Sequence, residues 1–241
     1  MSREVREQAQ PTGSRVLEMH AGTPRLNAWY YAKFADRIRG DVLELGSGIG
    51  NISRLLARDA DSLVATDVED AYLDTLRAEL APHPHAEVHR FDLDHPPPPA
   101  LAARRFDVVI SMNVLEHIHD DAAAVRQLVD LLRPGGWLLT YVPAGAFAFG
   151  PMDEALGHWR RYSTGAFRAL MQGAGLRVDR LEYMNLLGLA GWWVNGKLLR
   201  RRVPDPKQVH TFEKLVPLVR LEDHLRVPLG LGLICHAQKP A

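Results

Sequence analysis

A glycine-rich turn at residues 46–50 constrains this chain more than any other feature. The apolar run Val42 to Leu45 ends in the sequence Gly-Ser-Gly-Ile-Gly, and a helix-like stretch follows. A strand that passes through glycines into a helix lets the backbone approach a nucleotide closely, as in α/β proteins with a parallel sheet. The spacing is G-x-G-x-G, whereas a dinucleotide fingerprint places its third glycine where Asn51 stands. The turn therefore predicts a nucleotide-like ligand and disfavours a nicotinamide dehydrogenase.

The composition limits the classes of protein that remain. A chain of 241 residues suits one α/β domain, and its 29 basic and 29 acidic residues cancel, so a global attraction to nucleic acid is not expected. The single cysteine, Cys235, excludes an internal disulfide and a four-thiolate zinc site, and we expect it in the core. No leader and no long apolar run is present, which predicts a cytoplasmic enzyme.

Short strand-like runs alternate with longer helix-like runs, which is typical of a parallel sheet with crossover helices. We expect strands at Val42–Leu45, Ser62–Thr66, Glu87–Phe91, Asp107–Ser111, Trp137–Val142, Leu176–Leu181 and Leu231–Ala237. We expect helices at Ile52–Arg58, Ala71–Leu80, Asp121–Leu132 and Thr164–Ala174, the last capped by Ser163.

The connections carry signals of their own. The prolines at 96–99 predict an extended surface connection, and residues 132–136 predict a helix stop followed by a turn. Residues 144–161 lack a steady period and predict a loop over a site. Residues 1–14 predict a flexible tail, 15–241 a single domain, and 183–226 an insertion before the last strand.

The glycine turn, with Glu44 two positions before its first glycine, resembles the first motif of class I S-adenosylmethionine-dependent methyltransferases. The resemblance implies a Rossmann-like, doubly wound sheet of seven strands, mainly parallel with an antiparallel last strand, plus a helical insertion between the last two strands. It implies S-adenosylmethionine as cofactor. The residues it assigns to cofactor binding in this turn are Glu44, Gly46, Ser47, Gly48, Gly50 and Asn51.

Two acidic segments resemble the next motifs of the family. Asp67 lies 21 residues after Gly46, near the interval that brings a second-strand carboxylate to the first turn, where the resemblance implies that it binds the ribose with Val68 beside it. The alternative is that Asp67 caps the following helix. Asp92 is similar to the acid that reaches the adenine amine, with Leu93 against the ring; alternatively, Asp92 only caps a turn.

The segment from Phe106 to His119 looks like the fourth-strand motif and is closest to methyltransferases related to ubiquinone O-methylation. It implies that Asn113 lies at the cofactor. Some of those enzymes hold a divalent metal with an acid at this position and with equivalents of Glu116 and His117. The amide here leads us to predict no metal, a structural pairing of Glu116 with a neighbouring base, and an acid–base role for His117.

Residues 157–162 resemble the Gly-His-x-Arg-x-Tyr segment found after the fifth strand in many members. The resemblance suggests His158 as a second candidate base and Tyr162 on the acceptor side; the alternative is a loop held by ion pairs. The residues we assign to the acceptor are Tyr30, Tyr141, Trp159, Arg161, Tyr162 and Tyr183.

The expected reaction is methyl transfer to a small molecule, at a hydroxyl or carboxyl oxygen, in secondary or in cofactor- or lipid-linked metabolism. Transfer to nitrogen or carbon stays open, as does a regulator or scaffold that binds S-adenosylmethionine without transferring methyl. A nucleic-acid methyltransferase is disfavoured because Ser111-Met-Asn-Val114 stands where an Asn/Asp-Pro-Pro-Tyr-type motif would.

The insertion is unusually apolar and ends in a basic cluster at Lys197 and residues 200–202. Three interpretations remain open. It can be a helical cap over the acceptor pocket, an interfacial helix on a membrane, or a packing surface that includes a homodimer contact.

Overall fold

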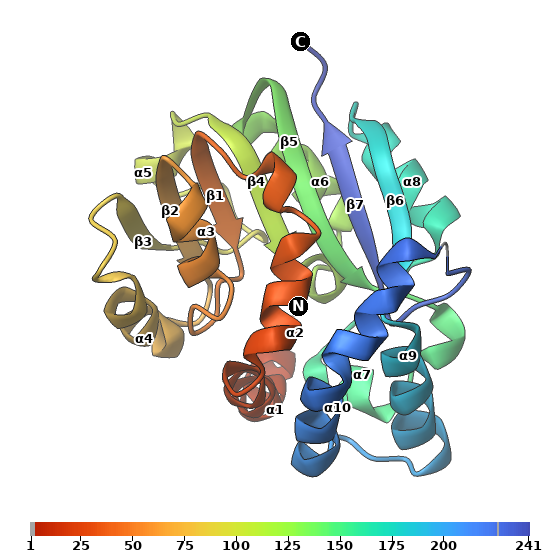
Figure 1. Cartoon of the computed structure of the whole chain (residues 1–241). Helices are drawn as coiled ribbons and strands as arrows, with labels where there is room; N and C mark the ends of the chain where they lie inside the picture. The colour runs from red at the N-terminus through yellow and green to blue at the C-terminus, as the bar shows by residue number, and fades with distance from the viewer. Residues whose placement is uncertain (1–2, 226) are drawn as a thin grey trace.

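The computed structural model describes residues 3–225 and 227–241 and contains one seven-stranded sheet in the order β3-β2-β1-β4-β5-β7-β6 (Figure 1). The strands are β1 Asp41–Leu45, β2 Ser62–Asp67, β3 Ala86–Arg90, β4 Phe106–Met112, β5 Leu132–Pro143, β6 Arg177–Met184 and β7 Gly232–Gln238. All pairs are parallel except those of β7, which runs antiparallel to β5 and to β6. The predicted fold class is therefore confirmed.

The strand order places a topological switch at the middle of the sheet. The chain leaves β1 for β2 and β3, then returns to the other side of β1 with β4, so that Leu45 pairs with both Thr66 and Ser111. Ligands of open α/β sheets bind in the crevice beyond the carboxyl ends of strands at such a point. The glycine turn follows β1 directly and lies at this edge.

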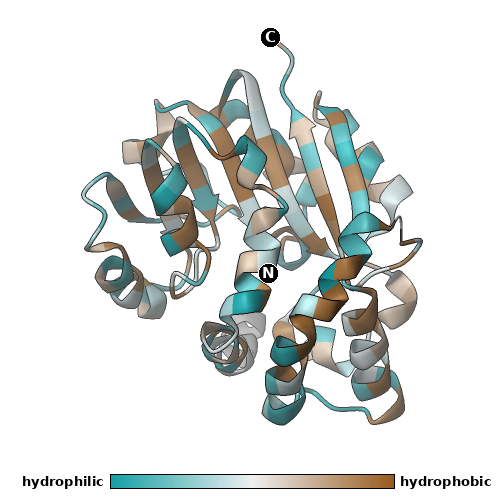
Figure 2. Cartoon of the chain, in the orientation of Figure 1, coloured by the Kyte–Doolittle hydropathy of each residue, from teal (hydrophilic) through white to brown (hydrophobic). Residues whose placement is uncertain are grey.

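Helices cover both faces of the sheet, and Figure 2 shows the hydrophobic residues concentrated in the strands. One face packs on α2 Pro24–Ala32, α3 Ser53–Asp59, α4 Asp70–Leu80 and α10 Pro206–Val219. The other packs on α5 Pro99–Ala102, α6 Asp121–Leu131 and α8 Thr164–Gly173. Because both faces are covered, strands such as β1 are apolar on both sides. Cys235 is fully buried in β7, as expected, and burial raises the pKa of its thiol to about 12.

The amino-terminal region differs from the prediction of a flexible tail. Arg3–Ala21 forms helix α1, so residues 3–14 are helical, and residues 1–2 lie outside the described part of the chain. The helix packs beside α7 (Pro151–Leu156), and the carbonyl oxygen of Leu17 accepts a hydrogen bond from Asn51 Nδ2 at 3.0 Å. Tertiary contacts of this kind stabilise helices whose sequence signal is weak.

Three connections also differ in detail. Residues 144–161, expected as a loop, contain the turn η3 (Ala146–Ala148) and α7. The expected turn at 132–136 instead opens β5, with a register shift against β4 between Phe106 and Val108. The proline-rich connection ends in the single turn of α5, which starts at Pro99, since proline is tolerated in the first turn of a helix.

The insertion forms a helical cap, which we define as residues 186–224: α9 Leu186–Trp193, the π-helical turn η4 Val194–Leu198, α10, and η5 Arg220–His224. Figure 1 shows α9 and α10 beyond the edge of the sheet that holds the carboxyl end of β5 and the amino end of β7. Ser163 caps α8, as predicted, by accepting a hydrogen bond from the backbone N–H of Ala166.

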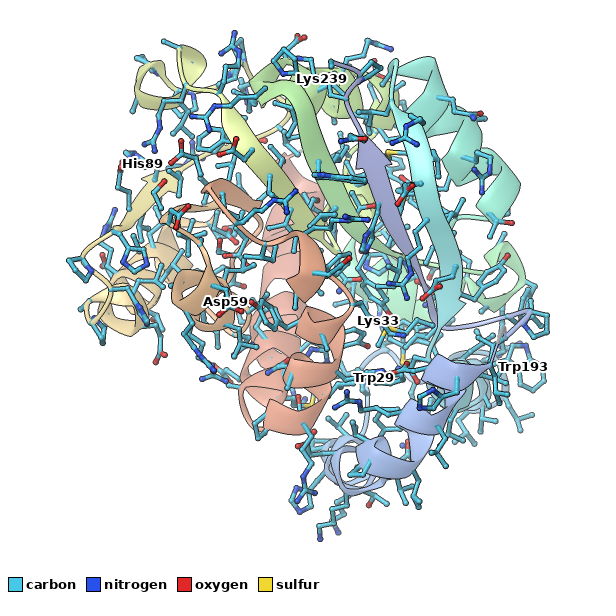
Figure 3. The ribbon with its side chains drawn as sticks, turned by 45° about the horizontal axis from the view of Figure 1, so that its top comes forward. Trp29, Lys33, Asp59, His89, Trp193 and Lys239 are labelled. Atoms are coloured by element: carbon cyan, nitrogen blue, oxygen red, sulfur yellow. The ribbon has the colours of Figure 1, made fainter. Side chains whose placement is uncertain are left out.

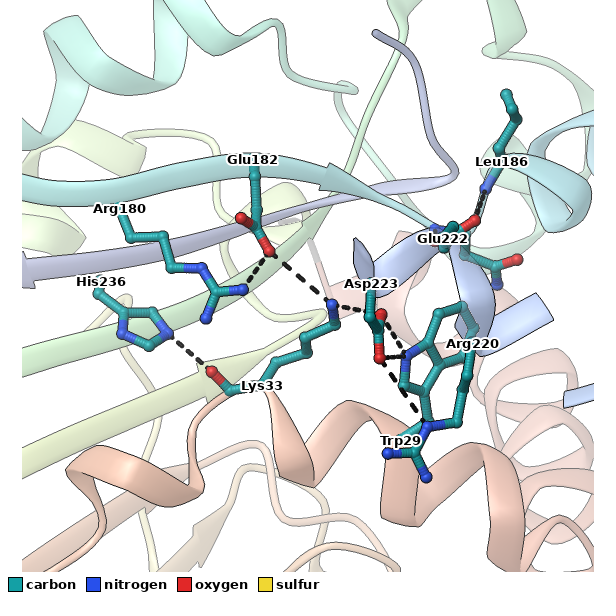
Figure 4. Close-up of polar contacts among 10 residues, drawn as sticks. Trp29, Lys33, Arg180, Glu182, Leu186, Arg220, Glu222, Asp223 and His236 are labelled. Atoms are coloured by element: carbon teal, nitrogen blue, oxygen red, sulfur yellow. Dashed lines mark hydrogen bonds and ion pairs between the residues drawn. The ribbon is translucent and has the colours of Figure 1, made fainter. Parts of the chain in front are cut away.

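Carboxylates of the cap bind the amino termini of two helices. Glu213 of α10 accepts hydrogen bonds from Arg25 N and Leu26 N of α2, at 2.8 and 3.0 Å. Glu222 of η5 accepts from the backbone N–H groups of Asn185 and Leu186 at the start of α9 (Figure 4). These N–H groups have no partner within their own helix, and a negative charge is favourable there.

A second contact ties η5 to α2. Asp223 accepts a hydrogen bond from Trp29 Nε1 at 2.9 Å and pairs with Lys33 Nζ at 2.6 Å (Figure 4). Figure 3 shows Trp29 and Lys33 on the same helical segment, facing the cap. The cap is therefore fixed to the sheet domain by charged and polar groups far apart in the sequence.

Candidate active site

A cavity of about 500 Å³ lies beyond the carboxyl ends of β1, β2, β4 and β5. Its sheet side is formed by the glycine turn and by the ends of these strands, and its outer side by α1, α9 and α10. This size is within the range of small-molecule sites.

The glycine turn requires glycine at two positions on the cavity wall. Gly46 and Gly48 have φ of 69° and 55°, in the left-handed region that side chains disfavour. A Cβ on Gly46 would lie 2.3 Å from Val114 Cγ2, and one on Gly48 would lie 3.0 Å from both methyl carbons of Leu17. Both glycines keep backbone at the cavity surface.

The other predicted residues of this turn support it from behind. Glu44 is buried beneath it and accepts hydrogen bonds from the hydroxyls of Ser47 and Ser53, while burial raises its pKa to about 7. Gly50 packs on α4, since a Cβ there would lie 3.3 Å from Leu76. Glu44, Ser47, Gly50 and Asn51, assigned from the sequence to cofactor contact, are absent from the cavity lining.

Asp67 joins the second strand to the glycine turn. It is 6% exposed, accepts hydrogen bonds from Gly48 N at 2.7 Å and from Glu69 N at 2.9 Å, and lines the cavity with Val68. Burial raises the pKa of its carboxyl group. The cap position of α4 is occupied by Glu69, so the alternative in which Asp67 itself is the N-cap does not describe this turn. A carboxylate can accept about four hydrogen bonds, so Asp67 keeps acceptor capacity for a ligand hydroxyl.

Three further predicted residues line the same part of the cavity: Asp92, Leu93 and Asn113. Asp92 also accepts a hydrogen bond from Asp94 N at 3.1 Å, which is the turn contact expected under the alternative interpretation. Asn113 follows β4 with φ of 53°, and its N–H donates to Tyr141 O at 2.8 Å. Its amide side chain therefore stands at the switch between β1 and β4.

An acid–base pair lies deeper in the cavity wall. His158 Nδ1 is 2.9 Å from Oδ1 of Asp153, a fully buried residue of α7. Asp153 also accepts from Arg161 Nε at 2.8 Å and from Trp192 Nε1 of α9 at 3.3 Å. Burial lowers the pKa of His158, although Asp153 opposes the shift. Burial would raise the pKa of Asp153, but the hydrogen bond with His158 and the charge of Arg161 hold it below its ordinary value.

Glu116 and His117 complete a cluster around His158. Glu116 Oε1 is 3.8 Å from His158 Nε2, too long for a hydrogen bond, and the His117 and His158 rings meet edge to face at 4.8 Å. Neither oxygen of Glu116 has a hydrogen-bond partner among the described residues, and burial raises its pKa to about 8. Glu116, His117 and His158 each offer one atom of the kind that binds metals, all within 4.8 Å of one another.

The predicted acceptor residues divide into two groups. Tyr30, Tyr141 and Arg161 line the cavity, with the two tyrosine rings 4.8 Å apart. Trp159 is 44% exposed, meets the His119 ring edge to face and is absent from the cavity lining. Tyr162 donates a hydrogen bond to Asp121 at the start of α6, which holds its loop in place.

Tyr183 also lies outside the cavity. It packs on the α6 and α8 face of the sheet, whereas its neighbour Met184 packs on the opposite face, where Tyr30 and Tyr141 lie. Successive residues of a strand point to opposite faces, so Tyr183 cannot reach the acceptor from β6.

Several cavity residues were missed from the sequence. They include Val16, Leu17 and His20 of α1, the N-cap Asn185 and Trp192 of α9, and Phe212 of α10. The orienting carboxylate Asp153 was missed as well. Their segments were recognised only as a tail, an insertion and a loop, and no local pattern shows which of their side chains meet the carboxyl edge of the sheet.

The fold and the cavity define an α/β enzyme with a ligand site at the topological switch, and the comparisons name its family. The family model for a methyltransferase domain matches residues 3–181. A protein from Mycolicibacterium smegmatis named probable S-adenosylmethionine-dependent methyltransferase is 31% identical over 74% of this chain and 70% of its own length. The chain therefore belongs to the S-adenosylmethionine-dependent methyltransferases of class I, and S-adenosylmethionine is its methyl donor.

Two further relatives are more distant. The ubiquinone biosynthesis O-methyltransferase of Parvibaculum lavamentivorans is 27% identical over 63% of this chain and 64% of its own length. The N-methyltransferase NodS of Bradyrhizobium japonicum, solved with S-adenosylhomocysteine, has a TM-score of 0.55 at 14% identity, covering 84% of this chain and 79% of its own. At that identity the likeness supports the fold alone.

Proposed function

We propose that this enzyme transfers the methyl group to an oxygen atom of a small acceptor with an apolar body. The observation that carries the proposal is the pair Asp153–His158: a buried carboxylate holds Nδ1 of a histidine that lines the cavity, and Nε2 lies 3.8 Å from Glu116 Oε1 without a hydrogen bond. The relative from P. lavamentivorans, a ubiquinone biosynthesis O-methyltransferase, supports oxygen as the acceptor atom.

The residues around the glycine turn fit the proposed donor. Gly46 and Gly48 place bare backbone at the cavity wall, where a Cβ would collide with Val114 or Leu17, and Asp67 offers carboxylate lone pairs beside it. Asp92, Leu93 and Asn113 line the adjoining wall. S-adenosylmethionine supplies a methyl group on a sulfonium, a good leaving group, so the protein has to align, exclude water and remove a proton.

His158 is the base in this proposal. With its Nδ1–H donated to Asp153, the lone pair of Nε2 is available to an acceptor hydroxyl. Burial lowers the pKa of His158, which keeps the ring neutral at pH 7. After proton transfer, the ionised Asp153 stabilises the imidazolium. Asp153 is thus a positioning residue, as the third group of a nucleophile–base–orienter arrangement would be.

The outer cavity favours an apolar acceptor. Leu26, Leu156, Leu187, Trp192 and Phe212 line it around Tyr30 and Tyr141. Such a wall suits a phenol, an apolar carboxylic acid or a lipid-linked ring, as in secondary or in cofactor- or lipid-linked metabolism. It has few polar groups that could bind a highly charged acceptor.

The test is S-adenosylhomocysteine release with matched phenols, carboxylic acids and amines of similar apolar size. The proposal expects turnover with an oxygen acceptor and little with the amines. Turnover confined to the amines, at a rate that survives His158→Ala, would assign a nitrogen methyltransferase instead.

A second role for the cluster of Glu116, His117 and His158 is cation binding, which would replace our prediction of no metal. The two unpartnered oxygens of Glu116 favour it, since buried carboxylates without a partner are often satisfied by an ion or water. Calorimetric titration with Zn²⁺, Mn²⁺ and Mg²⁺ separates the roles. Saturable binding that Glu116→Gln abolishes, together with chelator-sensitive turnover, supports the metal; turnover unchanged by chelator supports His158 as a metal-free base.

A further inference from the structure

The helix α9 and its extension η4 expose an apolar face to solvent. Leu186, Ala190 and Trp193 share one side of the helix at spacings of four and three, and Leu187, Val194 and Leu198 share the adjacent side. Leu198 is 68% exposed, Leu199 51% and Trp193 43%. Figure 3 shows Trp193 at the edge of the molecule, directed away from the sheet. The opposite side of the same helix holds Trp192, which contacts Asp153.

Positive charge gathers at the end of this face. No acidic residue occurs between Glu182 and Asp205, while Lys197, Arg200, Arg201 and Arg202 fall within that interval of a chain with zero net charge. Arg201 is engaged internally with Asn195 and Asp205. Lys197, Arg200 and Arg202 form no ion pair with any residue in the described part of the chain, so three cations stand beside the exposed leucines.

We propose that this surface, residues 186–202, docks on an anionic phospholipid membrane. Tryptophan and leucine on one helix face, with lysine and arginine at its end, is the pattern of helices that lie in the headgroup region. The long cationic side chains can reach lipid phosphates while Trp193, Leu198 and Leu199 enter the acyl boundary. None of the described helices is long and apolar enough to cross a membrane, so the contact is peripheral.

The charge pattern separates a membrane from a second copy of the chain. A two-fold dimer through this surface would bring the same patch of both subunits together, with the unpaired cations of one copy near those of the other. No acidic residue within the surface compensates that repulsion. An anionic membrane complements both its charge and its apolar side chains.

The docked surface adjoins the cavity. Leu187 and Gly191 are exposed and also line the cavity wall, so the mouth beside α9 would face the lipid. An apolar acceptor could then enter from the membrane. This last step rests on the proposed apolar acceptor, whereas the docking itself needs neither donor nor acceptor.

The experiment is flotation of the full chain with vesicles of phosphatidylcholine, with and without phosphatidylglycerol, in the absence of methyl donor. We expect binding only with the anionic lipid, weakened by salt. The triple variant Lys197→Gln, Arg200→Gln, Arg202→Gln should lower the partition coefficient on the order of 100-fold. The matched control Arg58→Gln, Arg126→Gln, Arg168→Gln removes equal charge from exposed positions elsewhere and should change it by less than about twofold.

The apolar contribution has its own variants. Trp193→Ser with Leu198→Ser should lower partitioning at least about tenfold with charge unchanged, and a blue shift of wild-type emission on vesicles should shrink in Trp193→Phe. Three results would each overturn the proposal: no binding of the wild type, equal losses in the triple variant and its matched charge control, or no loss in the double serine variant. Concentration-dependent dimers that Trp193→Ser abolishes, without vesicle binding, would assign the surface to a second copy. Because no turnover is measured, failure here leaves the proposed methyl acceptor untouched.

Discussion

Two regions meet at the cavity but are built differently: the glycine turn with the neighbouring strand ends, here called the glycine-turn half, and the helical cap, here called the cap half. The glycine-turn half is held together by contacts between neighbouring strand ends, as where Asp67 accepts a hydrogen bond from Gly48 N. The cap is attached by long-range contacts, such as Glu213 at the amino terminus of α2, and turns apolar side chains to the cavity. Under the proposed function, the glycine-turn half binds the donor, whereas the cap shapes the acceptor site. Damage to the first should therefore remove donor binding, and damage to the second should spare it.

The largest effect is expected from Gly46→Val. A Cβ at this position would lie 2.3 Å from Val114 Cγ2 and would require a disfavoured backbone, so donor binding measured by calorimetry should be abolished. Gly135→Val is the control, since Gly135 also has positive φ but nothing lies within 4 Å of its added Cβ. Normal affinity in Gly46→Val would contradict the placement of the donor at this turn.

His158→Ala tests the contact between the halves. If His158 is the base, turnover should fall by about 10²–10⁴-fold while donor affinity stays near that of wild type. Because burial lowers the pKa of His158, the acid limb of wild-type kcat/KM should lie below pH 6.5, and Asp153→Asn should lower kcat. The exposed His210→Ala serves as control. A loss smaller than about tenfold in both His158→Ala and His117→Ala would mean that the acceptor ionises without either histidine.

Asp67→Ala should weaken donor binding by more than about tenfold, since charge-assisted hydrogen bonds contribute about 1.5–3 kcal/mol each. The cap should be unaffected, so melting of the variant should show one cooperative transition. Asp130→Ala, on the exposed side of α6, is the control. An unchanged dissociation constant for the donor in Asp67→Ala would contradict the assignment of Asp67 to the ribose.

Glu116→Gln probes the buried carboxyl group at the junction through pH. Its folded pKa of about 8 lies above the ordinary 4.5, so the folded state binds the extra proton between these values. The unfolding free energy of the wild type should therefore fall as pH rises from 4.5 to 8, by up to about 1.4 kcal/mol per unit from this group. Denaturant titration across this range should show a smaller pH dependence of the unfolding free energy in Glu116→Gln than in the wild type. The same pH dependence in both proteins would refute the raised pKa of Glu116.

The smallest effect is expected in the cap. Glu213→Gln keeps the shape of the side chain but removes the charge at the amino terminus of α2, which should cost about 0.5–2 kcal/mol of unfolding free energy. Donor affinity should stay within about twofold of wild type, while KM for the acceptor rises. Exposed Glu154→Gln is the control. Loss of donor binding in Glu213→Gln would contradict the independence of the two halves.

The sequence alone was sufficient for the sheet and for the glycine turn that lines the cavity. All seven predicted strands are present, because alternation of apolar strands and helices and the glycines at 46 and 48 are local properties of the chain. The same reasoning did not show that Gly50 and Tyr183 lie outside the cavity lining, since a motif gives a residue's position along the chain but not the face on which its side chain lies.

Tertiary structure alone decided what closes the cavity. The contact of Asn51 with Leu17 spans 34 positions, and that of Trp192 with Asp153 spans 39. Local propensity carries no information about such partners, because their energies arise only when distant segments pack together. For the same reason a polar amino-terminal stretch became a helix that lines the cavity, and a buried aspartate became the partner of His158.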